Sequence, residues 1–201
     1  MISKNKKAIR IETGDGLIVV DVQNDFLPGG ALAVPEGEQV IPVLNRYIGT
    51  LTSKNLPVFA TRDWHPEGHS SFKDQGGPWP PHCLAGTEGA AFPPGLRLPP
   101  DTDVISISKG TDILRDTYSG FEGTDLDEKL RAKGVDRLLI GGLATDYCVL
   151  NTVKDAIKLG YRVLLLEDAI KAVNVNPDDG KRAVEEMVGL GALPIQWEMI
   201  E

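Results

Sequence analysis

Residues 16–22, GLIVVDV, decide the fold expected of this chain. They form a continuous apolar run with several β-branched residues, and Asp21 follows four apolar side chains directly. A run without alternation of polar and apolar residues is typical of a strand buried on both faces of a parallel sheet. Apolar residues then recur every three or four positions from Val40 to Leu51, which predicts a helix. A strand followed by a helix is the first half of a βαβ unit.

The same alternation continues to the end of the chain. Further strands are predicted at 56–63, 103–109, 137–142, 161–168 and 192–197, and further helices at 126–133, 145–159 and 178–190. Strands that alternate with helices build parallel sheets with helices on both faces. We therefore expect an α/β fold with three layers, α/β/α, and a six-stranded mostly parallel sheet. A length of 201 residues fits a single domain over 1–201.

Composition excludes several classes of protein. The chain has 21 Lys plus Arg against 29 Asp plus Glu, a formal charge of -8, which argues against a nucleic-acid partner. Its apolar runs are shorter than the ~20 residues of a membrane-spanning helix, so we expect a cytoplasmic protein without membrane association. Two cysteines, Cys83 and Cys148, are too few for a disulfide scaffold. Two free thiols are expected, and a single disulfide between them is the alternative. The sequence is compatible with a monomer and with a homo-oligomer.

One segment, residues 64–102, has neither helical nor strand periodicity. It holds eight of the 14 prolines and all three histidines, His65, His69 and His82. A loop of this length in a compact domain is usually functional. We therefore expect a loop insertion that carries a binding site.

Polar residues end the predicted strands. Asp21 ends the first, Asp63 the second and Lys109 the third, while the fourth runs through two glycines into the helix that carries Cys148. Ligands bind beyond the carboxyl ends of the strands in open parallel sheets. Two carboxylates, an ammonium and a thiol are therefore expected at one edge of the sheet.

A thiol in this position could be a nucleophile. With Thr145 as N-cap, Cys148 would lie in the first helical turn, where the helix dipole lowers a thiol pKa. Asp21 could act as its base, and Lys109 could hold Asp21, whereas Asp25 in the next loop is expected to be solvated. Each of the three has a structural alternative. Cys148 could be a small buried apolar side chain, Asp21 a turn-forming aspartate, and Lys109 a surface lysine.

The histidines suggest a metal site. Asp63 and His65 are two residues apart, and His82 adds a second imidazole, with His69 as a further candidate. Two histidines and one carboxylate leave coordination positions open and suit Zn²⁺, Fe²⁺ or Mn²⁺. The alternative is a loop with surface histidines. Cys83 is expected to be structural, because a second thiolate would close the site.

Three aromatic residues lie in predicted loops. Phe26, Trp79 and Tyr118 could form the walls of a pocket for a flat ring, or anchor their loops. Trp64, beside Asp63, is expected to pack.

Six fragments in order, VDVQNDFLPGGALAV, TRDWHPEGHSSF, GGPWPPHC, SKG, YSGFEGTDL and GLATDYCV, resemble the nicotinamidase branch of the isochorismatase-like cysteine hydrolases. The resemblance implies a six-stranded parallel sheet, which agrees with the strand pattern. It implies that Asp21, Lys109 and Cys148 form a catalytic triad. It also implies a cis peptide between Leu143 and Ala144.

The resemblance further implies a ligand set and a substrate. Asp63, His65 and His82 would bind one divalent metal, Zn²⁺ first and Fe²⁺ or Mn²⁺ as alternatives, while the role of His69 varies in the family. The backbone N–H groups of Ala144 and Cys148 would form the oxyanion hole, and Phe26, Trp79 and Tyr118 would hold the ring. The implied reaction is hydrolysis of nicotinamide to nicotinate and ammonia through a Cys148 thioester. The alternatives are a related hydrolase of another small amide and a non-catalytic metal-binding module.

Overall fold

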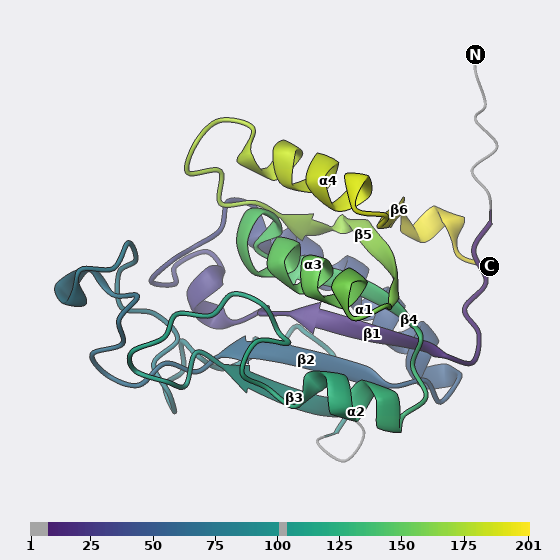
Figure 1. Cartoon of the computed structure of the whole chain (residues 1–201), viewed down its shortest axis with the longest axis horizontal. Helices are drawn as coiled ribbons and strands as arrows, with labels where there is room; N and C mark the ends of the chain where they lie inside the picture. Colours follow the sequence, from purple (N-terminus) through teal and green to yellow (C-terminus); the bar gives the residue numbers. More distant parts are fainter. Residues whose placement is uncertain (1–7, 101–103) are drawn as a thin grey trace.

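The computed structural model describes residues 8–100 and 104–201. Its sheet has six strands in the order β3-β2-β1-β4-β5-β6 (Figure 1). They are β1 (Asp15–Val20), β2 (Val58–Asp63), β3 (Val104–Lys109), β4 (Arg137–Leu143), β5 (Arg162–Lys171) and β6 (Leu193–Ile195). Every pair of neighbours among these described strands is parallel. The predicted parallel sheet is confirmed, and residue 103, the predicted start of the third strand, lies outside the described residues.

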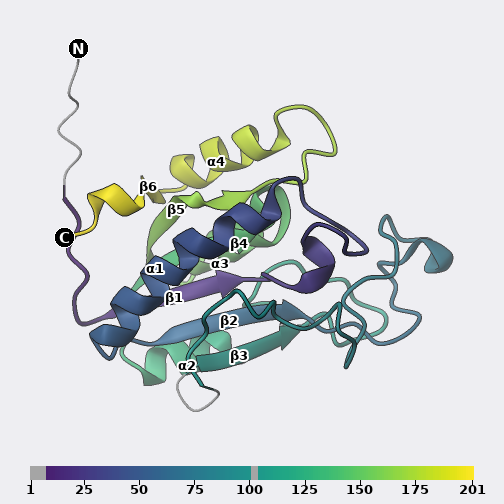
Figure 2. The same ribbon diagram turned by 180° about the vertical axis from the view of Figure 1, so that it is seen from behind.

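Helices cover both faces of the sheet, which confirms the three layers. The helix α1 (Val40–Ser53) packs on one face, shown toward the viewer in Figure 2, and the other face carries α2 (Leu126–Ala132), α3 (Leu150–Lys158) and α4 (Asp179–Gly189). Apolar side chains at helical spacing account for this packing. Leu44 and Tyr47 of α1 are fully buried in one core, and Leu130 and Val153 are fully buried in the other.

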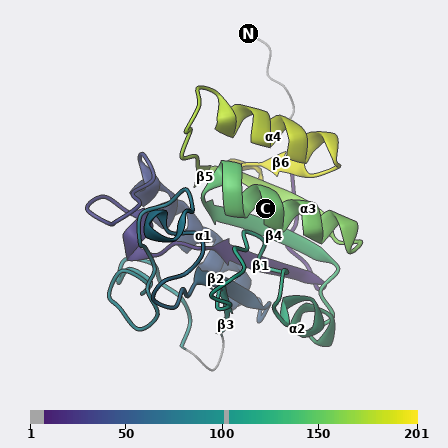
Figure 3. The ribbon, with the colours of Figure 1, turned by 60° about the vertical axis from the view of Figure 1, so that its left-hand side comes forward.

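The carboxyl ends of the parallel strands meet at one edge, on the left in Figure 1 and turned toward the viewer in Figure 3. Neighbouring strands β1 and β4 are followed by helices on opposite faces of the sheet, because α1 follows β1 and α3 follows β4. Such a change of side opens a crevice at the strand ends, which is where doubly wound sheets bind ligands. The crevice between β1 and β4 is therefore the expected position of the site.

The helix predicted at 145–159 begins differently from the prediction. A π-helical turn, Thr145–Val149, comes first and α3 follows it, and the N-cap is Ala144 instead of Thr145. The backbone N–H groups of Tyr147 and Val149 both donate to the carbonyl of Ala144, and the second of these bonds widens the turn. The Leu143–Ala144 peptide is cis, as the resemblance implied.

The segment after β2 has little regular structure over its described residues, as predicted. It contains one short 3-10 turn, Lys73–Gln75, and two isolated bridges, His65 with Leu84 and Phe72 with Trp79. Other 3-10 turns are Asn24–Phe26, Gly37–Gln39 and Trp197–Met199. Among the described residues, no helix has both the length and the apolar composition needed to cross a bilayer.

Candidate active site

A buried ammonium joins the residues that end the strands. Nζ of Lys109 lies 2.9 Å from Oδ2 of Asp21 and 2.5 Å from Oδ1 of Asp63. The same nitrogen lies 3.4 Å from Sγ of Cys148. All four side chains are buried. The expectation that two carboxylates, an ammonium and a thiol converge at one edge of the sheet is therefore confirmed.

Sheet register places these groups. Asp63 and Lys109 are partners at the last rung between β2 and β3, so their side chains leave the sheet side by side. Asp21 follows β1 with a φ of 47°, a left-handed conformation that turns the chain out of the sheet. The hydroxyl of Thr61 donates to Oδ1 of Asp21 at 2.6 Å and fixes the carboxylate.

The three charged groups stabilise one another inside the protein. Burial raises the pKa of Asp21, against the opposing effect of Lys109. Burial also acts to raise the pKa of Asp63, but Lys109 and His65 outweigh it and hold that pKa below its usual range. Burial opposes the charge of Lys109, yet the two carboxylates hold its pKa well above the ordinary value. The two carboxylates thus favour the charged form of Lys109.

The thiol of Cys148 does not have the lowered pKa expected at a helix start. Burial raises its pKa well above the ordinary value, Lys109 counteracts this, and the charges of Asp21 and Asp63 add to it. Desolvation of a thiolate outweighs the attraction of one ammonium that two carboxylates already share. Burial thus favours the neutral form of this thiol, and a carboxylate oxygen of Asp21 lies within 4.8 Å of its sulfur.

Three buried donors beside this cluster can hold a metal. Ligand atoms of Asp63, His65 and His82 all lie within 4.8 Å of one another. Nδ1 of His65 is hydrogen-bonded to the carbonyl of Gly110 at 3.0 Å, and Nδ1 of His82 to that of Pro80 at 2.8 Å. Both rings thus have Nε2 available, the arrangement in which outer hydrogen bonds orient metal-binding histidines.

The donor set fits a divalent cation in charge as well. When both carboxylates are ionised, Asp21, Asp63 and Lys109 leave one buried negative charge, which a neighbouring cation would offset. Burial lowers the pKa of His82, which favours the neutral, ligating imidazole. Gly110 leaves the space that His65 needs, because a Cβ there would lie 2.4 Å from Cε1 of the imidazole.

His69 and Cys83 lie near the donors in other roles. Nδ1 of His69 is hydrogen-bonded to Oγ of Ser71 at 2.7 Å and its Nε2 to the carbonyl of Arg115 at 3.2 Å, so protein groups occupy both nitrogens. Cys83 and Cys148 are both free. The backbone N–H of Cys83 donates to Asp25 at 2.7 Å. Asp25 is therefore a half-buried clamp between loops, and the expectation of a solvated side chain is wrong.

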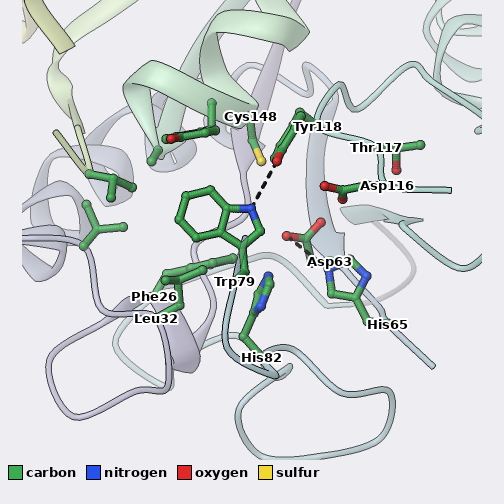
Figure 4. A pocket seen from close by; sticks show the side chains of 14 residues that line it. Phe26, Leu32, Asp63, His65, Trp79, His82, Asp116, Thr117, Tyr118 and Cys148 are labelled. Carbon is green, nitrogen blue, oxygen red and sulfur yellow. Dashed lines mark hydrogen bonds and ion pairs between the residues drawn. The ribbon is translucent and has the colours of Figure 1, made fainter. Parts of the chain in front are cut away.

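The pocket above Cys148 has aromatic walls (Figure 4). Phe26, Trp79 and Tyr118 all line it, and the indole N–H of Trp79 donates to the hydroxyl of Tyr118 at 3.1 Å. Tyr147 completes this wall, with its ring edge-on to Trp79 at 5.0 Å between centroids. Its empty space is about 440 Å³, including the opening to solvent. The lining also includes Leu32, Val34, Asp63, His65, His82, Asp116, Thr117, Ala144, Cys148 and Val173.

Sequence reasoning missed Gln23, which positions Asp63. Its side-chain carboxamide accepts from the backbone N–H of Asp63 at 2.8 Å and donates to the carbonyls of Asp63 and Ala90 at 2.8 and 2.9 Å. This amide extends the ladder between β1 and β2 after the backbone of β1 turns away at Asp21. A polar residue two positions after a strand-end aspartate was the available signal.

Residues 15–199 match the isochorismatase domain family. The chain belongs to the isochorismatase family. Nicotinamidase from Escherichia coli is 42% identical over 197 residues, covering 88% of this chain and 92% of that protein.

Solved structures of this family superpose closely on the chain. A pyrazinamidase of Pyrococcus horikoshii in complex with zinc has a TM-score of 0.87 and 50% identity, covering 92% of this chain and 99% of that one. A protein from L. infantum in complex with nicotinate has a TM-score of 0.86 and 35% identity, covering 96% and 98%. This chain therefore has the fold of these structures, and in addition a buried set of donors, Asp63, His65 and His82, that suits a divalent metal.

Proposed function

We propose that this isochorismatase-family chain hydrolyses nicotinamide to nicotinate and ammonia, with Cys148 as the nucleophile. The observation that carries the proposal is the position of the Cys148 sulfur. It lies 3.4 Å from Nζ of Lys109 and within 4.8 Å of a carboxylate oxygen of Asp21, in an aromatic pocket that Asp63, His65 and His82 also line. The nicotinamidase from E. coli and the nicotinate-bound protein from L. infantum support the choice of substrate.

The charges of the pocket favour a neutral ring. Asp63 and Asp116 line it, and its described lining includes no lysine or arginine that could pair with a carboxylate on the ligand. A dicarboxylate such as isochorismate would therefore meet these like charges, with the proposed metal as its one cationic partner among the described lining residues. A neutral carboxamide avoids this repulsion.

The metal is proposed to be a divalent cation held by Asp63, His65 and His82, with Zn²⁺ as the first candidate. When bound, it would supply a Lewis acid that takes the pyridine nitrogen and withdraws electrons from the ring. The zinc complex of the P. horikoshii pyrazinamidase supports this assignment. Phe26, Trp79 and Tyr118 would hold the ring faces and orient the carboxamide toward Cys148.

Acylation begins with a proton transfer from the neutral thiol to Asp21. The thiolate forms on the side of Lys109, whose charge stabilises it, and attacks the carboxamide carbon. The backbone N–H groups of Ala144 and Cys148 are proposed to bind the oxyanion, and each such donor contributes about 10²–10³-fold. Asp21 then returns the proton to the leaving nitrogen, and ammonia departs.

Deacylation uses the same base. Asp21 takes one proton from water, and the hydroxide attacks the thioester carbon. As the carbon–sulfur bond breaks, Asp21 returns that proton to the sulfur, and the carboxylic acid releases its remaining proton to solvent as nicotinate. A general base of this kind contributes about 10²–10⁴-fold. Burial raises the pKa of Asp21, which makes its carboxylate a stronger base than an exposed one.

The test measures ammonia release from nicotinamide and from benzamide, which lacks the ring nitrogen. The metal-loaded protein should turn over nicotinamide, and benzamide should react at least ~10-fold more slowly, a loss of the size seen when a metal contact is weakened. Cys148→Ala should abolish ammonia release while Zn²⁺ binding persists, and Cys83→Ala serves as the matched control. Substantial turnover by Cys148→Ala would refute the proposal. So would a wild-type protein that releases no ammonia when Zn²⁺, Fe²⁺ and Mn²⁺ are each added in turn.

A further inference from the structure

The carboxylate of Asp63 faces two cation positions at once. Its Oδ2 lies 3.7 Å from Nε2 of His65, in the metal-binding donor set, and its Oδ1 lies 2.5 Å from Nζ of Lys109. A carboxylate that bridges two cations is the usual core of two-metal sites, in which the ions lie about 3.5–4 Å apart. In this protein, an ammonium takes the place of the second ion.

Four donors surround that ammonium. Besides Asp63, Oδ2 of Asp21 lies 2.9 Å from Nζ of Lys109, and Sγ of Cys148 and the carbonyl of Thr117 each lie 3.4 Å away. The ligand atoms of Asp21, Asp63 and Cys148 lie within 4.8 Å of one another. Zinc bonds to oxygen and sulfur measure about 2.0–2.3 Å, so inward movements of about an ångström convert the ammonium contacts into metal bonds.

We propose that Lys109 occupies the second position of a carboxylate-bridged two-cation site, and that Asp21, Asp63 and Cys148 bind a soft divalent cation once the ammonium is displaced. Thiolate selects soft cations such as Zn²⁺ and Cd²⁺ over Mg²⁺ or Ca²⁺. Binding forms one metal–sulfur bond, and the thiol proton leaves to solvent with no change of oxidation state. Such a cation inhibits any reaction at Cys148, because it occupies the sulfur and its base together.

In this proposal Lys109 has a second role, in addition to its ion pair with Asp21. It fills the position at Cys148 with a charge that cannot ligate, while the position at His65 and His82 stays available to a metal. The two positions share only Asp63, so one ion can occupy the histidine side without displacing the ammonium. The inference concerns cation binding alone and does not depend on which amide the protein hydrolyses.

The test compares Cd²⁺ binding by metal-free wild-type protein and Lys109→Met, in which a side chain of similar length carries no charge. Equilibrium dialysis gives the stoichiometry, and ultraviolet charge-transfer absorption reports a cadmium–thiolate bond. Lys109→Met should bind a second Cd²⁺ at least ~100-fold more tightly than wild type, because a competing unit charge has left a buried site. The second ion should bring the thiolate absorption. Lys158→Met, an exposed lysine of α3, is the matched control and should behave as wild type.

Cys148→Ser in the Lys109→Met background should remove both the second ion and its absorption, whereas Cys83→Ser should retain them. A single bound ion in Lys109→Met, or a second ion without thiolate absorption, would overturn the proposal. If Lys109→Met does not fold, the wild-type protein decides the question. Cd²⁺ beyond the first equivalent should then protect Cys148 from iodoacetamide, as peptide mass spectrometry reports, and alkylation unaffected by excess Cd²⁺ would overturn the proposal. No amide is present, so either result leaves the proposed hydrolysis to be judged by its own test.

Discussion

Replacement of Gln23 by methionine should destabilise the protein and weaken metal binding together. Methionine has nearly the same length and fills the same space, but it lacks the carboxamide. Three backbone groups then lose their partner: the N–H and carbonyl of Asp63 and the carbonyl of Ala90. Gln23 is fully buried, so water cannot replace the lost hydrogen bonds without opening the structure.

The size of the effect follows from these three contacts. A buried backbone group left without a hydrogen bond costs at least ~1 kcal/mol, so the free energy of unfolding should fall by about 3 kcal/mol. This corresponds to about a 100-fold increase in the unfolding equilibrium constant. Loss of an outer-shell contact to a metal ligand lowers affinity by about 10–100-fold, and the same loss is expected for Zn²⁺ at Asp63.

Two measurements check these numbers. Urea unfolding of the metal-free protein gives the change in stability, and competition with a chelating dye gives the Zn²⁺ affinity. Gln75→Met, at an exposed position of the 3-10 turn Lys73–Gln75, is the control and should change neither quantity. If the free energy of unfolding of Gln23→Met lies within ~1 kcal/mol of the wild-type value and its Zn²⁺ affinity is unchanged, Gln23 does not position Asp63 as described.

Three further outcomes are expected. Asp21→Asn should bind nicotinamide yet form no thioester, and mass spectrometry that finds an acyl adduct on Cys148 would contradict the role of Asp21. Thr61→Val removes a hydrogen bond that lowers the pKa of Asp21, so the acidic limb of the kcat/KM profile should move to higher pH. The sign follows because the base must be deprotonated, and a limb that stays in place or moves to lower pH rejects the argument. His69→Gln should retain one bound metal ion by elemental analysis, because both its ring nitrogens already have protein partners; loss of the ion would make His69 a ligand.

The arrangement of the sheet and the convergence of the catalytic candidates could be predicted from local patterns. Apolar runs without alternation identify buried strands, and all parallel strands bring their carboxyl ends to one edge. Asp21, Asp63 and Lys109 stand directly at those ends, so their meeting needed no knowledge of loop paths. The loop histidines were also identifiable as candidates, because all three histidines of the chain lie within residues 64–102.

Other features depend on contacts that no local pattern contains. Gln23 acts on groups 40 and 67 positions away in the sequence, and its role emerges only when β1 and β2 are paired. The wide turn Thr145–Val149 depends on where the carbonyl of Ala144 lies. The pKa of Cys148 was predicted in the wrong direction because a helix terminus is visible in sequence, whereas complete burial beside two carboxylates is not.

The proposed catalytic groups and the walls of the pocket come from different parts of the architecture. Lys109 ends β3, and Asp21 and Cys148 come soon after β1 and β4. Phe26, Trp79 and Tyr118 come from connections outside the sheet. Connections tolerate insertion and replacement far better than paired strands do. Substitutions in these connections can therefore reshape the pocket walls and leave the sheet that positions Asp21, Lys109 and Cys148 unchanged.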